Sequence, residues 1–229
     1  MTTKFENQEF ECIYDRDSAG RFSDLIFDRC LFDNCAFSIC ETPSARSIAR
    51  NVQFINCKQK SCTLRSGILE NVYIKNLHTN GLLQFFGTAL QHVVLEGEIG
   101  TLMFSSDVDL LGENPSKQQA FDQANELYYS RVDWALDISN AHFHSITLRG
   151  IPGELVIRDE ESQGLVLKSD LQDNRWMDYD FDGTYWKATL AFIQKSKWDS
   201  GVLAVLRLNR NASAFQKVLD FLRSEGIAS

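Results

Sequence analysis

The sequence contains no run of apolar residues long enough to cross a membrane, which takes about 18 or more in succession. Its N-terminus also lacks the basic segment and apolar stretch that direct secretion, because residues 1–12 are polar and acidic. We therefore expect neither membrane insertion nor signal-directed secretion. A cytoplasmic location is the expectation that follows.

Basic residues are too few to make the chain positively charged. The 23 Lys and Arg are outnumbered by 31 Asp and Glu, so the formal net charge is −8 and the isoelectric point is near 5.0. A protein that binds nucleic acid directly normally presents a basic face that displaces counterions from the phosphates. The composition argues against direct binding of nucleic acid.

Familiar catalytic motifs are also absent. The chain has no G-x-S-x-G, no phosphate-binding G-x-x-x-x-G-K-[ST] and no C-x-x-C pair with the spacing of a zinc site. We therefore predict no catalytic residues, no bound cofactor, no resident metal and no enzyme activity.

Two groups of polar residues are the only metal-site candidates. His142 and His144 would share one face of a strand, and imidazole is a common metal ligand. Asp178, Asp180 and Asp182 precede a glycine, as at the start of an EF-hand calcium loop.

We favour exposed polar faces over metal sites at both places. Phe143 lies between the two histidines, which is typical of a strand with one buried side. In the aspartate segment, the twelfth loop position holds Thr189 where calcium requires a glutamate. Tyr179 and Phe181 alternate with the aspartates and predict the buried side of a strand there.

What the sequence does contain is a spacing of five residues. This spacing matches neither the 3.6-residue period of a helix nor the two-residue period of a lone strand, so it indicates a repeat architecture. We call the large residue of each unit its centre. The centres are Phe22, Phe27, Phe32, Phe37 and Thr42, and then Phe54, Gln59, Leu64, Leu69, Ile74 and Thr79.

A second column of small or apolar residues lies two positions before each centre. It contains Cys30, Cys35, Cys40, Cys57 and Cys62. We expect both columns to be buried, and the polar residues after each centre to face water or form corners, which asparagine tolerates. Since a free cysteine behaves as a small buried hydrophobe, we predict reduced structural thiols rather than disulfides.

The segments FDRCLFDNCAFSIC and CKQKSCTLRSGILENVYIKN resemble the repeats of pentapeptide-repeat proteins. The resemblance covers residues 20–80 and implies a right-handed, four-sided parallel β-helix, a solenoid in which four units make one coil. Steps of twelve residues, from Phe10 to Phe22 and from Thr42 to Phe54, predict loops at residues 15–21 and 42–45. We expect weaker continuation of the inner wall at residues 93–104 and 141–148.

The chain is expected to divide near Pro115, where Gly, Asn, Pro and Ser precede a helical pattern over residues 117–130. We predict a mainly β chain with a pentapeptide-repeat-like solenoid at 1–115 and an irregular β continuation with an α+β cap at 116–229. Within the cap the sequence predicts strands at 154–158, 164–168 and 201–208. It also predicts a helix after Thr184 and a terminal helix at 212–225, capped by Asn211 or Ser213.

Three functions remain open from the sequence. The favoured one is a non-enzymatic interaction scaffold that binds a protein partner through the solenoid wall or the cap, with an immunity- or antitoxin-like protein as its specific version. The second is a DNA mimic acting on a topoisomerase, which the resemblance implies for an acidic solenoid. The third is a metal-dependent enzyme using His142, His144 or residues 178–182.

Overall fold

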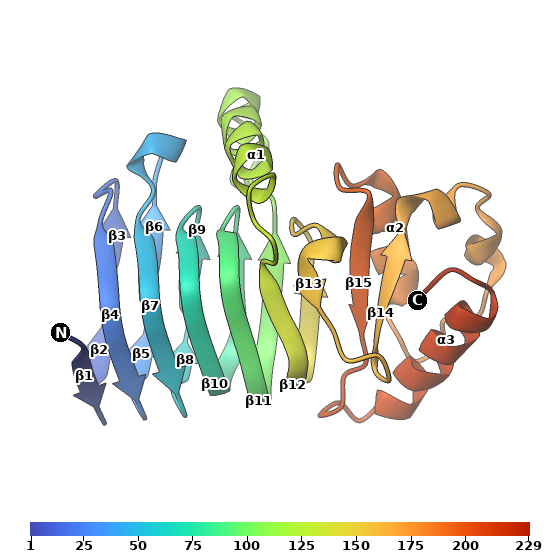
Figure 1. Cartoon of the computed structure of the whole chain (residues 1–229), viewed down its shortest axis with the longest axis horizontal. Coiled ribbons are helices and arrows are strands. Elements are labelled where there is room, and N and C mark those ends of the chain that lie inside the picture. Colours follow the sequence, from blue (N-terminus) through green and yellow to red (C-terminus); the bar gives the residue numbers. More distant parts are fainter.

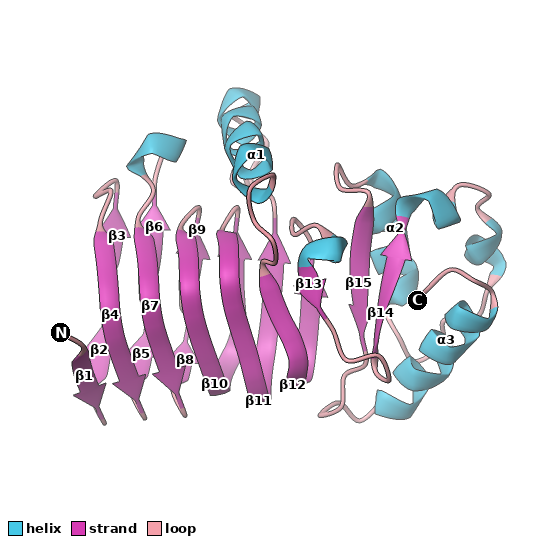
Figure 2. Cartoon of the chain, in the orientation of Figure 1, coloured by secondary structure: helices cyan, strands magenta, loops and turns pink.

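The computed structural model describes residues 1–229 and is mainly β (Figure 1). Its large parallel sheet is curled into a half-barrel, and its helices are few (Figure 2). The strands of this sheet are β1 (Thr3–Glu6), β2 (Glu9–Glu11), β3 (Tyr14–Arg16), β4 (Arg21–Asp28), β5 (Leu31–Asp33), β6 (Ala36–Ile39), β7 (Ile48–Ile55), β8 (Lys58–Lys60), β9 (Thr63–Arg65), β10 (Ile68–Phe86), β11 (Ala89–Ser105), β12 (Leu136–Leu148) and β13 (Val156–Ile157).

The strands form three parallel ladders. One ladder runs β1, β4, β7, β10, β11, β12 and β13, while β2, β5 and β8 form a second and β3, β6 and β9 a third. Strand β10 pairs in turn with β7, β8 and β9, so it passes through all three ladders. Successive segments of the chain therefore stack on one another in each ladder, as the five-residue spacing predicts.

The register of the ladders confirms the stacking of both columns. The centre Phe27 pairs with Phe5 before it and Phe54 after it, and Ile74 continues this column. Leu25, Val52 and Val72 stack in the same way two residues earlier. The predicted loop at residues 42–45 is also confirmed, because Pro43–Ala45 form a short 3₁₀ helix between β6 and β7.

Left-handed backbone conformations mark the corners of the sheet, both between ladders and, as at Asn71, within the first ladder. The residue two positions after a centre repeatedly has a φ of about +50° to +65°. These corner residues include Asn7, Asn34, Asn56, Ser61, Ser66, Asn71 and Asn76. Asparagine adopts this conformation more readily than most residues, which explains the polar positions after each centre.

Cysteine fits the small column because its thiol also donates weak hydrogen bonds. The Sγ atom of Cys35 donates to the carbonyl of Phe10 at 3.2 Å, and Cys57 donates to that of Phe27 at 3.3 Å. Cys62 repeats the contact on Phe32. All six cysteines are free thiols, as the spacing predicts.

Burial of the centre column is only partly as expected. Ile74 and Phe104 are buried, whereas Phe27, Phe32 and Phe54 are only half-buried. The half-buried centres line a cavity that the side chains of the first strands do not fill. The expectation that every centre is buried is therefore wrong for this part of the sheet.

Of the remaining elements, helix α1 (Pro115–Tyr129) lies beside the middle of the sheet, and the others cover its C-terminal end (Figure 1). Helix α1 connects β11 to β12, and an antiparallel pair, β14 (Gln163–Leu167) and β15 (Ser200–Ala204), lies beyond β13 with α2 (Trp186–Lys195) and α3 (Ala212–Ser224). Short 3₁₀ turns occupy Gly153–Leu155, Lys168–Leu171 and Arg175–Asp178. No helix has the length and apolar character needed to span a membrane.

Three local predictions for this end need correction. The strand predicted at 154–158 is confirmed only at Val156–Ile157, which form β13, whereas Glu154 and Leu155 belong to a 3₁₀ turn in which the N–H of Glu154 donates to the Ser200 hydroxyl. Asn211 occupies the N-cap position of α3, but its side chain donates to the carbonyl of Gly183 instead of capping the helix. The segment around Tyr179 and Phe181 is turn, not strand.

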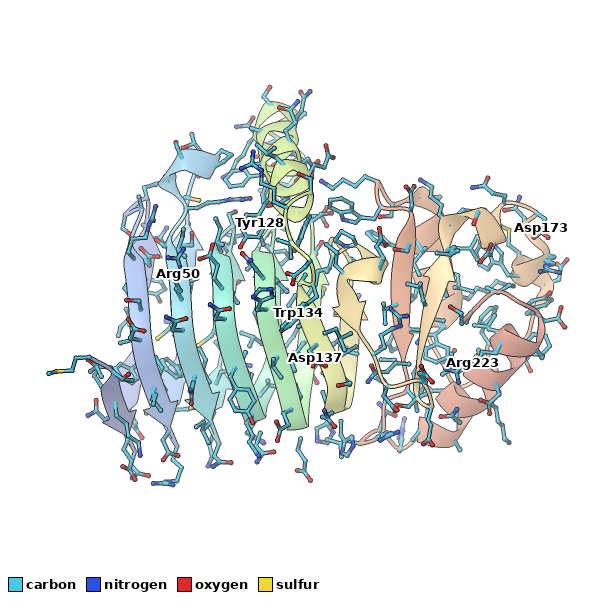
Figure 3. All side chains as sticks on the ribbon, viewed as in Figure 1. Arg50, Tyr128, Trp134, Asp137, Asp173 and Arg223 are labelled. Carbon is cyan, nitrogen blue, oxygen red and sulfur yellow. The ribbon has the colours of Figure 1, made fainter.

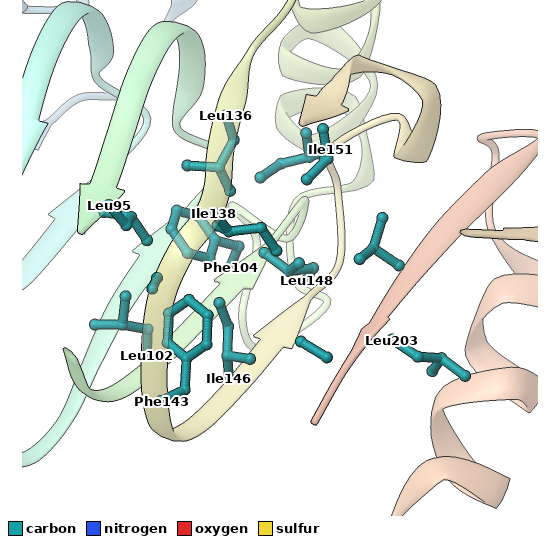
Figure 4. Packing of buried hydrophobic residues seen from close by; sticks show 14 of the residues in the cluster. Leu95, Leu102, Phe104, Leu136, Ile138, Phe143, Ile146, Leu148, Ile151 and Leu203 are labelled. Carbon is teal, nitrogen blue, oxygen red and sulfur yellow. The ribbon is translucent and has the colours of Figure 1, made fainter. Parts of the chain in front are cut away.

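One hydrophobic cluster of 45 buried residues joins the sheet to the terminal helices. Figure 4 shows its middle, where Phe143 and Ile146 of β12 pack near Leu102 and Phe104 of β11. Leu203 of β15 belongs to the same cluster. The continuation of the sheet predicted at 93–104 and 141–148 is confirmed, since these residues lie in the paired strands β11 and β12, with one register shift between Val94 and Glu96.

Candidate interaction surface

Corner residues of neighbouring strands form a hydrogen-bonded row on the outside of the sheet. Asn51 Nδ2 donates to Asp24 Oδ1 at 3.0 Å, and Asn71 Nδ2 donates to Asn51 Oδ1 at 3.2 Å. Next along the row, His92 Nδ1 lies 3.1 Å from Asn71 Oδ1, and His92 Nε2 lies 2.6 Å from Asp133 Oδ1. We call these five residues the corner row.

The corner row is fixed by the backbone as well as by its hydrogen bonds. Asp24, Asn51, Asn71 and His92 all have left-handed backbone with φ between +53° and +58°. Their side chains leave the sheet at the same position of successive coils because the neighbouring strand residues are in register. The row is consequently a preorganised line of polar groups.

His92 is the point where the row meets an aromatic side chain. The imidazole lies 4.6 Å from the ring of Trp134, measured between centroids. Both ring nitrogens lie within hydrogen-bond distance of oxygen atoms, one of Asn71 and one of Asp133. Trp134 itself is half-buried and offers part of its ring to solvent.

A second polar group lies beside the row on the same side of the sheet. Arg50 Nε donates to Glu70 at 2.7 Å, and the Tyr128 hydroxyl donates to the other oxygen of the same carboxylate at 3.3 Å. Figure 3 shows Arg50, Tyr128 and Trp134 over the strands from β7 to β12. The surface thus combines arginine, tyrosine and tryptophan, the side chains that dominate binding energy at protein interfaces.

The histidines singled out from the sequence lie elsewhere. His142 and His144 project from β12 on the side opposite to the buried Phe143, as the alternation predicts. His142 Nε2 lies 3.2 Å from the guanidinium of Arg207, which also binds Asp159. His144 is exposed.

The aspartates of residues 178–182 form a local turn. Asp180 accepts a hydrogen bond from the N–H of Asp182, and Asp182 accepts one from the N–H of Gly183. Across the whole chain, no three His, Cys, Asp or Glu side chains converge in a way that could hold a metal ion. The structure does not bring the histidines and the aspartates into one site.

The buried cysteines are poorly placed for nucleophilic chemistry. Burial raises the pKa of Cys57 to about 11 and also raises the pKa of Cys40 and of Cys62. Thiolate, not thiol, is the reactive form, so these side chains carry little reactive species at neutral pH.

No protein-family model matches the chain, and no curated protein sequence matches it.

Sequence reasoning missed the corner row. Asn51, Asn71 and His92 lie 20 or 21 residues apart, which is the spacing between paired positions of β7, β10 and β11, but this long period is hidden by the shorter five-residue spacing. His92 and Trp134 are also separated by the loop and α1, so only the folded chain brings them together.

The ionisation of Asp133 should be visible in the stability of the protein. The hydrogen bond from His92 holds the pKa of the Asp133 carboxyl below its ordinary value of 3.8. The charged carboxylate therefore stabilises the fold above the unfolded pKa, and the contribution is lost as the pH falls through the lower, folded pKa.

We expect the wild type to be more stable than Asp133→Asn at pH 7, and the difference to shrink as the pH is lowered below 3.8. Urea unfolding of both proteins across this range measures the effect. A difference that stayed constant with pH would show that His92 does not interact with the ionised carboxylate.

Proposed function

We propose that this chain is a pentapeptide-repeat-like, right-handed solenoid and acts as a non-enzymatic scaffold that binds a protein partner. The proposal is carried by the corner row with its neighbouring Arg50, Tyr128 and Trp134. In this view the closed end formed by α2 and α3 is the cap, and the protein works in the cytoplasm. An immunity- or antitoxin-like role, in which an acidic chain covers a toxin enzyme, is the specific form we favour.

The fixed geometry of the surface supports this proposal. Binding costs less entropy when the side chains are already held in place, and the corner row is held by hydrogen bonds from Asp24 to Asp133. The carboxylates of Glu70 and Asp133 are tied to Arg50 and His92. A partner would therefore meet ordered donors and acceptors beside aromatic rings.

Affinity capture with paired variants tests the proposal. We expect the wild-type protein to retain one dominant partner from a lysate of its source cells, and Arg50→Ala/Trp134→Ala to lose it. With the purified partner, calorimetry should show at least about a tenfold weaker affinity for this double variant, as expected for hot-spot residues.

The matched control is Leu167→Ala/Arg210→Ala, which removes exposed residues from the far end of the molecule. This control should bind the partner as the wild type does. Capture of chaperones alone, or equal binding by both double variants, would contradict the assignment of this surface.

A further inference from the structure

An apolar cavity of about 400 Å³ lies inside the curled sheet, between the ladders. Of its 24 lining residues 21 are hydrophobic, and they extend from Phe5 of β1 to Phe85 of β10. Protein interiors normally contain few voids larger than one water molecule. A cavity of about 150 Å³ already binds benzene, and ligand pockets begin at about 300 Å³.

The sequence explains why this interior is not filled. Ala49 is paired in its ladder between Phe22 and Leu69, so a methyl group stands between two large side chains. Asp15 also lines the cavity, where a fully apolar interior would hold a hydrophobe. The half-buried Phe27 and Phe54 border the remaining space.

The cavity contains a buried hydrogen-bond donor without a partner. Gln59 lines it and is only 3% exposed. Its Oε1 accepts the N–H of Cys62 at 3.1 Å, but its Nε2 has no acceptor. Buried polar groups nearly always have a partner, because an unmade hydrogen bond costs stability. An acceptor atom inside the cavity would complete the bonding of this amide.

The charged residues of the lining indicate which ligand charge the cavity can accept. Asp15 is the one charged residue there, and its carboxylate is already bonded to the backbone N–H of Ser38 and to the hydroxyl of Ser18. No basic residue lines the space. An anionic ligand would therefore be repelled and would lose its hydration without compensation.

The cavity reaches solvent at the N-terminal end of the sheet. Ile13 and Phe22 belong to its lining and are 53% and 41% exposed. Gln59 lies deeper, in β8, paired between Phe32 and Thr79. A ligand could thus enter past apolar side chains and place its acceptor against the amide.

We propose that this cavity binds a small, uncharged, mainly apolar molecule that carries a carbonyl oxygen, such as a medium-chain ketone or ester. The hydrocarbon part fills the space between the aromatic centres, and the carbonyl accepts from Gln59 Nε2. This site is independent of the protein-binding surface on the outside of the sheet.

The probes are 2-decanone and decane, measured by displacement of the fluorescent naphthyl ketone 6-propionyl-2-(dimethylamino)naphthalene. We expect saturable binding of one dye per chain, with a blue-shifted emission, and displacement by both probes. Gln59→Leu keeps the apolar volume and removes the donor. This substitution should lower the affinity for 2-decanone by about tenfold and leave the affinity for decane unchanged, as the loss of one hydrogen bond predicts.

Two filling variants, Ala49→Leu and Ala36→Leu, test the location from different ladders. Each should abolish dye binding while the thermal midpoint of unfolding stays level or rises, because filling a void adds contacts. Absence of saturable binding would overturn the proposal. So would dye binding that survives both folded filling variants, since it would then occur on the surface. A preference for ketone over alkane that persists in Gln59→Leu would overturn the role of the amide.

Discussion

Replacing Phe143 with alanine should lower the free energy of unfolding by about 3–5 kcal/mol, the range found for a fully buried phenylalanine. Phe143 has no exposed surface and lies in β12, paired with Ile99 of β11. Its carbonyl accepts the N–H of Leu208, from the segment after β15. The side chain is therefore fully buried where the curled sheet joins the terminal region.

Two comparison variants make this prediction specific. His144→Ala changes the next residue of the same strand, which is exposed, and should have an effect within about 0.5 kcal/mol. Phe32→Ala removes the same side chain from the half-buried lining of the cavity and should cost less than Phe143→Ala. Urea unfolding of the three variants gives the order, and equal losses at Phe32 and Phe143 would show that the cavity is filled.

The ladders could be predicted from the sequence because their signal is local. Each centre and its small partner are two residues apart, and the corner residue follows the centre by two more. The columns at Phe27 and Val52 stack because this short pattern recurs in each of the paired strands β4, β7 and β10. Helix α3 was predictable for the same reason, since its apolar face, which includes Phe215 and Leu222, repeats within the helix itself.

The cavity and the corner row could not be predicted in this way. Whether Ala49 leaves a void depends on the volumes of side chains in three paired strands. The local sequence around Ala49 gives no information about those volumes. The meeting of His92 with Asp133 depends on the length of the loop and helix between β11 and β12. Of the strand predicted at 154–158, Glu154 and Leu155 form a 3₁₀ turn instead, and the N–H of Glu154 donates to Ser200, 46 positions away in the sequence.

Arg46 is a further residue whose environment only the structure reveals. It is 5% exposed, and no carboxylate lies within ion-pair distance of it. Its guanidinium stands 4.9 Å from the centroid of Phe121, its Nη2 reaches the carbonyl of Gly87 at 3.4 Å, and its Nε has no partner. Burial lowers its pKa to about 10, which indicates how poorly the charge is solvated.

Arg46→Met should therefore raise the free energy of unfolding, by about 1–4 kcal/mol, the range seen when hydrophobic residues of similar volume replace buried ionic groups. Methionine keeps much of the apolar stem against Phe121 and removes the unpaired charge. The carbonyl of Gly87 still accepts a hydrogen bond from Asn125 Nδ2 at 3.2 Å, so the substitution leaves no buried acceptor without a partner.

Arg65→Met is the matched control, because Arg65 also stands over a phenylalanine ring, at 5.7 Å from Phe86, but is half-exposed. Its charge is already hydrated, so its removal should change stability by no more than about 0.5 kcal/mol. Thermal and urea unfolding of both variants separates the cost of burying the charge at Arg46 from the effect of replacing a hydrated arginine beside a phenylalanine ring. A loss of stability in Arg46→Met would mean that the attraction between the guanidinium, the ring of Phe121 and the Gly87 carbonyl exceeds the cost of burying the charge.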